Sequence, residues 1–307
     1  MIYTVTLNPS LDYLVRTDAL RPGALCRTHD ETLYPGGKGV NVSLVCAALG
    51  LPTRALGFIA GRTGAMFASL LAETGVEYDF CRLEQGMTRI NVKVSAHEQT
   101  ELNAAGPAIP AAAIERLAAA LDTLGEGDWL VLSGSLPADV PADTYARLLD
   151  RVRGRGVQTL VDTSGDALKN ALPCAPDLIK PSLSVLDELV GGAPRTPAGI
   201  AACARELQRA GAQDILIPLG DGGAVLVPAS GDALYLPAAP VEPVQPVGMN
   251  DSMAAGWLYA KAHHFSAPDV LRFAAAAGTA AMLSAWLPDR HAVESALART
   301  EQPRPCQ

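Results

Sequence analysis

Trp129-Leu-Val-Leu-Ser-Gly-Ser135 is the clearest indicator of the fold class in this chain. It is followed by a segment with helical spacing of apolar residues, Ala142 to Arg153, and then by Thr159-Leu-Val-Asp-Thr-Ser-Gly165. Both apolar runs end in small polar residues and glycine, which is typical of a buried strand that opens into a loop. Strand, helix and strand in this order predict a β-α-β unit with parallel strands.

The same alternation continues on both sides of this unit. Short apolar runs cover 2–7, 178–180 and 215–219, and helical patterns cover 39–49, 111–124 and 200–210. Repeated units of this kind build one sheet with helices on both faces. We therefore predict an α/β fold with a doubly wound, mostly parallel sheet, in a single domain over residues 1–300.

Two stretches depart from this rhythm, at residues 13–33 and 88–102. In the second, Ile90, Val92 and Val94 alternate with polar residues, which is typical of a strand with one wetted face. We expect the two stretches to form a small β-sheet that acts as a lid over an active site. The apolar face of such a lid also makes it the expected contact of a homodimer.

Composition excludes several classes of partner. The chain of 307 residues is 49% hydrophobic but only 5% aromatic, which suits close packing of helices on a parallel sheet. A net charge of -8, with no run of Lys or Arg, argues against nucleic acid. The apolar stretch Phe273 to Leu287 is too short to span a membrane, so we interpret it as a buried helix.

The cysteines and the chain ends indicate the setting. Six cysteines are scattered without CxxC pairs or zinc spacing, so we expect no metal held by protein ligands. The beginning of the chain lacks the layout of a secretion signal, and a cytoplasmic location follows as an expectation. Residues 301–307 include two prolines and are expected to be disordered.

Pro35-Gly-Gly-Lys-Gly-Val-Asn41 places glycines and a lysine just before a helical pattern. Backbone amides and a cation there can meet an oxyanion or a sugar hydroxyl. The motif is not a Walker A loop, because Gly39 rather than Ser or Thr follows Lys38. Taken alone, it is equally well interpreted as a glycine-rich turn with an exposed lysine.

Val247-Gly-Met-Asn-Asp-Ser-Met253 precedes another helical run of small residues. Asp251 would lie in the first turn of that helix, where an aspartate ordinarily caps backbone amides. Taken alone, the segment is no more than a helix start.

Read together, the motifs resemble the PfkB group of ribokinase-like carbohydrate kinases. The resemblance covers residues 1–297 and is strongest to 1-phosphofructokinases and tagatose-6-phosphate kinases. It rests on Thr6-Leu-Asn-Pro-Ser-Leu-Asp12, Pro35 to Asn41, Thr88-Arg-Ile-Asn-Val-Lys93, Ser133-Gly-Ser-Leu-Pro137, Asp162-Thr-Ser-Gly165, Ile179-Lys-Pro181 and Gly248-Met-Asn-Asp251, in that order.

The resemblance implies an ATP- and Mg²⁺-dependent kinase that phosphorylates an alcohol group of a sugar phosphate. Asp251 matches the aspartate that takes the proton of the attacked hydroxyl, beside an anion hole that includes Gly248 and Asn250. Sugar-binding roles fall to Asp12, Gly37, Lys38, Asn41, Ser133 and Ser135, and the sugar's own phosphate to Arg89, Lys38 and Lys93. Without the resemblance, the charges at 89 and 93 would be incidental to a solvated lid strand.

On the nucleotide side, the resemblance assigns cofactor binding to Lys180, Ser182, Gly220, Gly222, Met249 and Ser252. This chain departs from the family pattern there. Gly-Ala-Gly-Asp becomes Gly-Met-Asn-Asp, so Asn250 stands where glycine would permit a positive φ, and the bulk of Met249 threatens the γ-phosphate.

Further departures concern magnesium. Ser182 and Val185 replace an asparagine and a glutamate that organise Mg²⁺ through water, unless Asp187 or Glu188 substitutes. Proline also occupies polar positions of the family, at 218 and 246.

The leading hypothesis is therefore phosphorylation of fructose 1-phosphate to fructose 1,6-bisphosphate. A tagatose-6-phosphate kinase is the alternative within the same chemistry. A regulatory protein that binds a sugar phosphate with a degenerate nucleotide site is the alternative from another class. A kinase of an unphosphorylated sugar or nucleoside also stays open.

Overall fold

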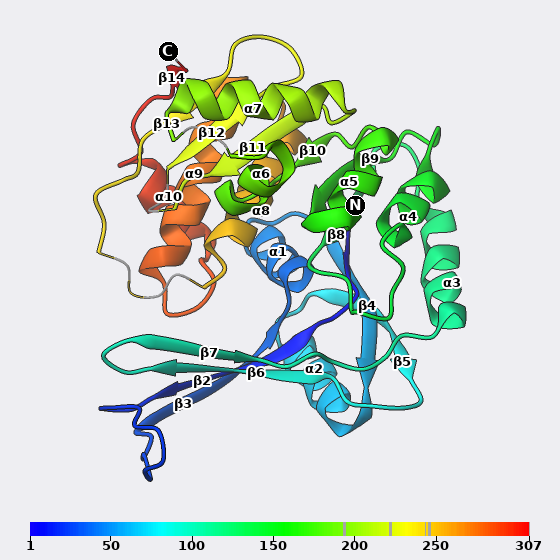
Figure 1. Ribbon diagram of the computed structural model, residues 1–307, viewed down its shortest axis with the longest axis vertical. Coiled ribbons are helices and arrows are strands. Elements are labelled where there is room, and N and C mark those ends of the chain that lie inside the picture. The colour runs from blue at the N-terminus through cyan, green and yellow to red at the C-terminus, as the bar shows by residue number, and fades with distance from the viewer. Residues whose placement is uncertain (193–194, 221–222, 243, 245–246, 307) are drawn as a thin grey trace.

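A ten-stranded sheet forms the centre of the protein, as seen in the computed structural model, which describes residues 1–192, 195–220, 223–242, 244 and 247–306 (Figure 1). Across the sheet the strands are β14 (Arg304–Pro305), β13 (Leu234–Leu236), β12 (Ala224–Val227), β11 (Asp214–Pro218), β10 (Leu178–Ile179), β9 (Gln158–Asp162), β8 (Trp129–Ser133), β1 (Ile2–Thr6), β4 (Thr53–Ala60) and β5 (Glu77–Leu83).

The strands from β11 to β5 are parallel, and β12 to β14 continue the sheet antiparallel. Strand β8 shows why these segments become strands. Leu130 and Leu132 pack into one core cluster, Trp129 and Val131 into another, so both faces of the strand are covered. The predicted doubly wound, mostly parallel sheet is confirmed.

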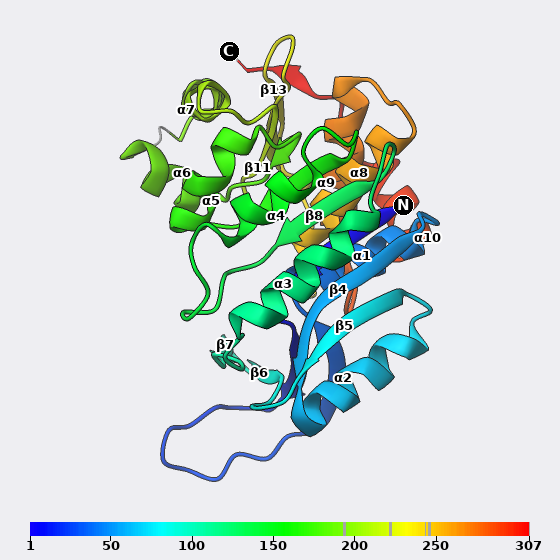
Figure 2. The same cartoon turned by 90° about the vertical axis from the view of Figure 1, so that its right-hand side faces the viewer.

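Helices cover both faces of this sheet (Figures 1 and 2). On one face lie α1 (Lys38–Ala48), α8 (Met249–Ala262), α9 (Ala267–Leu283) and α10 (Arg290–Leu297). On the other lie α3 (Ala111–Ala120), α4 (Thr144–Val152), α5 (Gly165–Ala171), α6 (Leu183–Val190) and α7 (Pro197–Arg209), with short 3-10 turns at Leu121–Thr123 and Leu172–Cys174. The main sheet and these helices are called the body below.

Helices α8 and α9 form the tightest helix pair. A Cβ on Gly256 would lie 2.8 Å from the Cβ of Ala277, so the small residues of both helices let their backbones approach closely. The expected buried helix at 273–287 is α9, which ends earlier, at Leu283. Among the described residues, no helix has both the length and the apolar character needed to cross a membrane.

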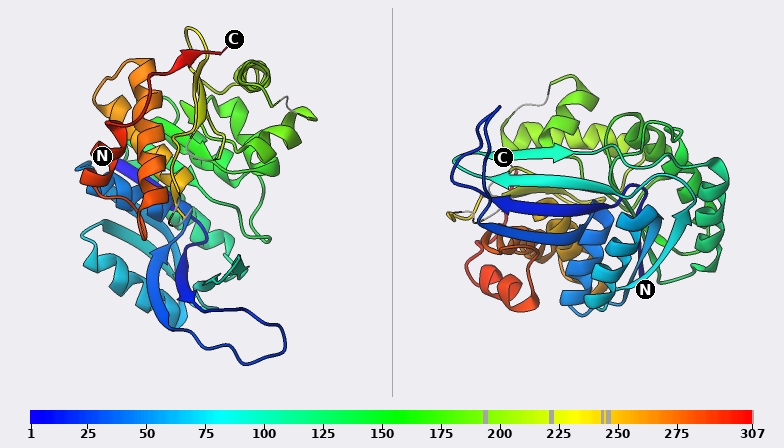
Figure 3. Two further views of the ribbon diagram at one scale, coloured as in Figure 1. Left: turned by 90° about the vertical axis from the view of Figure 1, so that its left-hand side faces the viewer. Right: turned by 90° about the horizontal axis from the view of Figure 1, so that it is seen from below.

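A second, four-stranded sheet forms the lid (Figures 1 and 3). It consists of β3 (Asp30–Gly36), β2 (Ser10–Arg16), β6 (Arg89–Ser95) and β7 (Gln99–Asn103), in that order. Strands β2 and β6 are parallel, and the outer pairs are antiparallel. The predicted small β-sheet is confirmed, and helix α2 (Gly61–Glu73) packs under it and against β4.

The end of the chain differs from the expectation for residues 301–307. Arg304 and Pro305 pair with β13 as an edge strand, and the amide of Cys306 donates to the carbonyl of Ala233 at 2.9 Å. Cys306 also packs against the core, which gives this short segment an apolar anchor. The expected disorder is therefore wrong for 304–306.

Candidate active site

A cleft of about 520 Å³ lies between the lid and the body. It brings together most of the residues predicted for the sugar and for catalysis: Asp12, Gly37, Lys38, Asn41, Arg89, Lys93, Ser135, Gly248 and Asp251. The carboxyl ends of parallel strands and the starts of α1 and α8 meet at the same place, which is where open α/β sheets bind ligands.

Asp251 lies in the first turn of α8 and is almost completely buried. Its Oδ2 accepts a hydrogen bond of 2.8 Å from Nδ2 of Asn41. Burial, together with the negative charge of Asp162, raises the pKa of Asp251 to about 6, although Lys180, Lys38 and Asn41 oppose the shift. The carboxylate is thus ionised at neutral pH and more basic than an exposed one, as a general base requires.

Asp162 joins two lysines beneath this carboxylate. Its Oδ1 lies 3.3 Å from Nζ of Lys38 and its Oδ2 3.0 Å from Nζ of Lys180. Burial opposes ionisation, but the two ammonium groups hold the pKa of Asp162 below its ordinary value. The charge of Asp162 in turn raises the pKa of Lys38. Two cations are therefore fixed close to Asp251.

Asp162 had no role assigned from the sequence, although its motif was recognised. The available signal was its position, because it is the last residue of the buried parallel strand β9. Lys180 directly follows β10 and is also buried, so it reaches the site through Asp162 rather than by lining the cleft.

The turn before α8 keeps the geometry of an anion site. Gly248 has a φ of 76°, and a Cβ there would lie 2.4 Å from Cδ2 of Leu287. Met249 and Asn250 are the first helical residues of α8, and Asn250 does not have a positive φ. The positive φ that a glycine at position 250 would permit is therefore not used here, and Gly248 carries the positive φ before α8. The amides at the start of α8 can still bind a phosphoryl group.

Two of the buried hydroxyl groups that lack partners among the described residues belong to predicted site residues. They are Oγ of Ser252, in the first turn of α8, and Oγ of Ser133, the last residue of β8. Ser252 is fully buried and does not line the cleft. Ser133 does not line the cleft, because Gly134, with a φ of 110°, turns the chain so that Ser135 does.

On the lid, the carboxylate of Asp12 is held from several sides. Ser10 Oγ donates to Oδ1 at 2.7 Å, Asn91 Nδ2 donates to it at 3.1 Å, and Lys93 Nζ lies 3.1 Å from Oδ2. A Cβ on Gly36 would lie 2.6 Å from Cγ of Asp12, so only glycine fits beside it. Asp12 is a fixed acceptor facing the cleft, as binding of a sugar hydroxyl requires.

Arg89 is anchored by backbone carbonyls at the entrance to the same cleft. Its Nε donates to the carbonyl of Asn8 at 3.2 Å, and its Nη1 donates to that of Ala104 at 3.3 Å. Burial lowers the pKa of Arg89, and Asp12 partly offsets this. In the part of the chain that the structure describes, no carboxylate forms an ion pair with this guanidinium, which leaves its charge for an anionic ligand.

Four further polar residues line the cleft without having been predicted: Ser10, Asn91, Glu101 and Asn103. The period of two along a strand could have found Asn91, which stands between Arg89 and Lys93 on the same face of β6. Glu101 and Asn103 follow only from the pairing of β7 with β6.

The positions that the resemblance assigns to magnesium do not fit that role. Oγ of Ser182 accepts from the amide of Val185 at 3.3 Å and so caps α6, while the Val185 side chain packs on the core. Of the proposed substitutes, Asp187 pairs with Arg195 and Glu188 is exposed. Over the described ranges, no three acidic, His or Cys side chains gather into a metal site.

Of the remaining predicted nucleotide residues that the structure describes, Gly220 and Met249 do not line the cleft. Gly220 has a φ of 78° in the turn after β11, which ends at Pro218. Gly222 and Pro246 lie outside the described residues. Met249 does not line the cleft, so its bulk is not directed at the sugar pocket.

Comparison with known proteins agrees with this geometry. Residues 6–285 match the family described as pfkB family carbohydrate kinase. The chain is 34% identical to 1-phosphofructokinase of Bacillus subtilis (strain 168), over 97% of each chain. It is also 34% identical to D-tagatose-1-phosphate kinase of Bacillus licheniformis, over 94% of this chain and 95% of the relative.

Among solved structures, phosphofructokinase-2 from Escherichia coli in complex with substrates and products superimposes with a TM-score of 0.91. That match has 31% identity and covers 97% of this chain and 98% of the other. The sequence match, the related enzymes and the shared fold all lead to the same conclusion: this chain belongs to the pfkB family of carbohydrate kinases.

Proposed function

We propose that the protein transfers the γ-phosphoryl group of ATP to fructose 1-phosphate and so forms fructose 1,6-bisphosphate. The observation that carries this proposal is the buried carboxylate of Asp251. It stands at the start of α8, in a cleft whose other wall carries Arg89 and Asp12. A base, an anion site and a cationic lid thus meet in one pocket.

In the proposed reaction, the acceptor hydroxyl of the sugar attacks the γ-phosphorus. The new O–P bond forms as the bond from phosphorus to the bridging oxygen breaks and ADP leaves. Asp251 accepts the proton of the hydroxyl. Because Asn41 holds Oδ2, Oδ1 is the oxygen left for that proton.

Developing negative charge would be stabilised from two sides. The amides at the start of α8 would lie on one side of the phosphoryl group. Lys38, which is held by Asp162, supplies a cation on the other. Mg²⁺ is proposed to arrive bound to the phosphates of ATP, where it neutralises their charge. No step is assigned to it, since Ser182 and Val185 do not fit its support.

The residues of the lid are evidence that the substrate is phosphorylated, and they suggest how it is oriented. Arg89 would bind the phosphate, Asp12 would accept from ring hydroxyls, and the acceptor hydroxyl would lie at Asp251. Fructose 1-phosphate and tagatose 1-phosphate both carry phosphate on C1 and a free hydroxyl on C6. The related 1-phosphofructokinase and D-tagatose-1-phosphate kinase support this class of substrate by their names. Tagatose 6-phosphate would have to bind with C1 at Asp251.

The proposal also covers the cellular location of the protein and its oligomeric state. All six cysteines are free, which supports a reducing cytoplasm. On the face of the lid opposite Asp12, a row of apolar side chains supports a homodimer: Tyr13, Val92 and Leu102.

A second function, binding of a sugar phosphate without phosphoryl transfer, is favoured only by the residues at the expected magnesium positions, Ser182 and Val185. A protein that binds a sugar phosphate but transfers no phosphoryl group would need the lid and Asp12, but not polar groups at Ser182 and Val185. Such a protein would act as a sensor of the sugar phosphate.

The test is phosphoryl transfer from ATP and Mg²⁺ to fructose 1-phosphate, tagatose 1-phosphate and tagatose 6-phosphate, with native protein and Asp251→Asn. We expect turnover fastest with fructose 1-phosphate and reduced roughly 10²- to 10⁴-fold in the variant. Calorimetry measures binding in parallel. Sugar-phosphate binding with no turnover in native protein would select the sensor.

A further inference from the structure

The lid touches the body through an aromatic contact beside the sugar pocket. Tyr34 of β3 and Trp286, which follows α9 in the body, stack with ring centroids 4.1 Å apart and planes within 5°. Tyr34 is the direct cross-strand neighbour of Asp12 in the lid. A residue of the body therefore packs next to the carboxylate that faces the cleft.

The same indole also meets a cation of the lid. Nζ of Lys93 lies 5.9 Å from the centre of the Trp286 ring and 3.1 Å from Oδ2 of Asp12. The Lys93 side chain is only 11% exposed, so water screens these contacts weakly. Lys93 is thus held between a carboxylate of the lid and an aromatic ring of the body.

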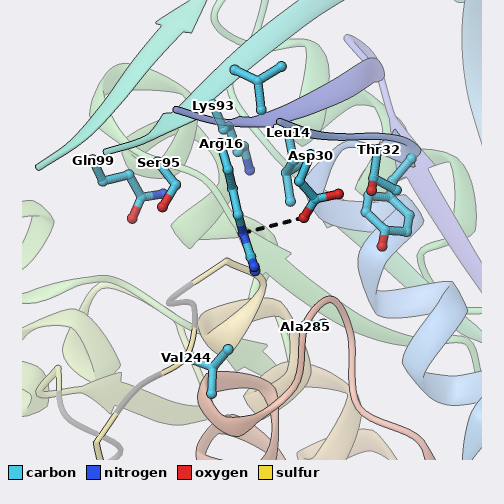
Figure 4. Close-up of a pocket in the computed structure, with 11 residues that line it drawn as sticks. Leu14, Arg16, Asp30, Thr32, Lys93, Ser95, Gln99, Val244 and Ala285 are labelled. Atoms are coloured by element: carbon cyan, nitrogen blue, oxygen red, sulfur yellow. Dashed lines mark ion pairs between the residues drawn. The ribbon is translucent and has the colours of Figure 1, made fainter. Parts of the chain in front are cut away.

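Beyond Lys93, the lid and the body stand apart. A chamber there is lined by Lys93, Tyr34 and outer lid residues on one side and by Val244 and Ala285 on the other. Figure 4 shows Val244 and Ala285 on the body facing the ion pair of Arg16 with Asp30 across this space. The stack on Trp286 accordingly lies at the inner end of this chamber.

Leu287, the residue after Trp286, links the aromatic contact to the anion site at the start of α8. Leu287 packs on the turn at Gly248, where a Cβ would lie 2.4 Å from its Cδ2. One short segment of the body therefore touches the lid through Trp286 and the anion site through Leu287.

We propose that Trp286 is a positioning residue for the sugar phosphate. Its ring holds Lys93 on Asp12 and latches the lid against the body through Tyr34. The proposal rests on the proposed kinase function for its kinetic readout, but the latch itself is measurable without turnover.

The kinetic test compares Trp286→Ala with Trp286→Phe. Loss of the stack and of the cation contact should raise KM for fructose 1-phosphate roughly fivefold to thirtyfold, with KM for ATP within about twofold of native. Phe keeps a ring for Tyr34 and should restore KM to within about threefold of native. Tyr34→Ala should reproduce the effect, and the double variant should be no worse than either single one.

The second readout is acrylamide quenching of tryptophan fluorescence. Trp129 and Trp257 are buried, so Trp286 is the partly exposed indole that reports on the contact. Tyr34→Ala should increase quenching in the free protein, and sugar phosphate should protect the native protein. Unchanged quenching in Tyr34→Ala, or an unchanged KM in Trp286→Ala, would overturn the latch. Protection by sugar phosphate without turnover would instead sink the kinase proposal and leave the latch standing.

Discussion

Nδ2 of Asn41 donates a 2.8 Å hydrogen bond to Oδ2 of Asp251, across 210 positions of sequence. The bond joins the first turn of α1 to the first turn of α8, so two helix starts from opposite ends of the chain share one buried carboxylate. Its presence favours the ionised form of Asp251, against the burial that disfavours it.

The pH dependence of turnover should follow this carboxylate. Because the pKa of Asp251 is raised to about 6, protonation below that value removes the base, and kcat should fall as the pH drops through 6. Asn41→Leu removes a hydrogen bond that lowers the pKa of Asp251, so its acid limb should move to higher pH. Initial rates at saturating substrates from about pH 4.5 to 8.5 measure the acid limb of the native protein and that of the variant. A native profile that is flat across pH 6 would exclude Asp251 as the base.

Asp162→Asn should move the acid limb the other way. The variant removes a negative charge that raises the pKa of Asp251, so the limb should shift to lower pH. It also leaves Lys38 and Lys180 without their shared counter-charge, which should destabilise the fold by roughly 3–5 kcal/mol in urea unfolding. Asp166→Asn, which breaks an exposed pair with Lys169, is the control and should change neither quantity.

Arg89→Ala should weaken binding of the sugar phosphate specifically. Loss of charge-assisted hydrogen bonds to a phosphate predicts a rise in KM of roughly 10- to 100-fold, with KM for ATP unchanged. Arg16→Ala removes another arginine of the lid, paired with Asp30, and should leave KM near native. Equal losses for the phosphorylated sugar and for its unphosphorylated parent would disprove the phosphate assignment.

Gly248 should be much more sensitive to substitution than Asn250. Gly248→Ala places a Cβ against Leu287 in a left-handed conformation, so we expect a loss of roughly 1–3 kcal/mol in unfolding free energy and a lower kcat. Asn250→Gly affects a residue without positive φ and should change stability by less than about 1 kcal/mol. Thermal unfolding and steady-state rates compare the two, and an inverted order would contradict the description of the anion site.

The outer face of the lid should control assembly. Val92 lies between Tyr13 and Leu102 in the apolar row, so Val92→Glu should convert a dimer into a monomer. Sedimentation velocity over a range of protein concentrations measures this, with Glu101→Gln on the cleft face as the control. Native protein that sediments as a monomer at every concentration would rule out the lid interface.

Local pattern determined much of the architecture and part of the site. Apolar runs that end in small polar residues indicated the parallel strands, and alternation at Ile90, Val92 and Val94 indicated the lid. The ordered motifs also identified Asp251, Asp12 and Arg89, which the folded chain brings to one cleft. These features depend on short segments of sequence, so they can be predicted without the three-dimensional structure.

The tertiary structure alone decided which groups act on one another. Asp162 meets Lys38 and Lys180 only because the ends of two parallel strands and the start of a helix converge, and the raised pKa of Asp251 follows from burial among them. The stack of Tyr34 on Trp286 likewise joins lid and body over most of the chain length. Sequence spacing carries no record of such distances, because burial and Coulomb interactions depend on separation in space rather than along the chain.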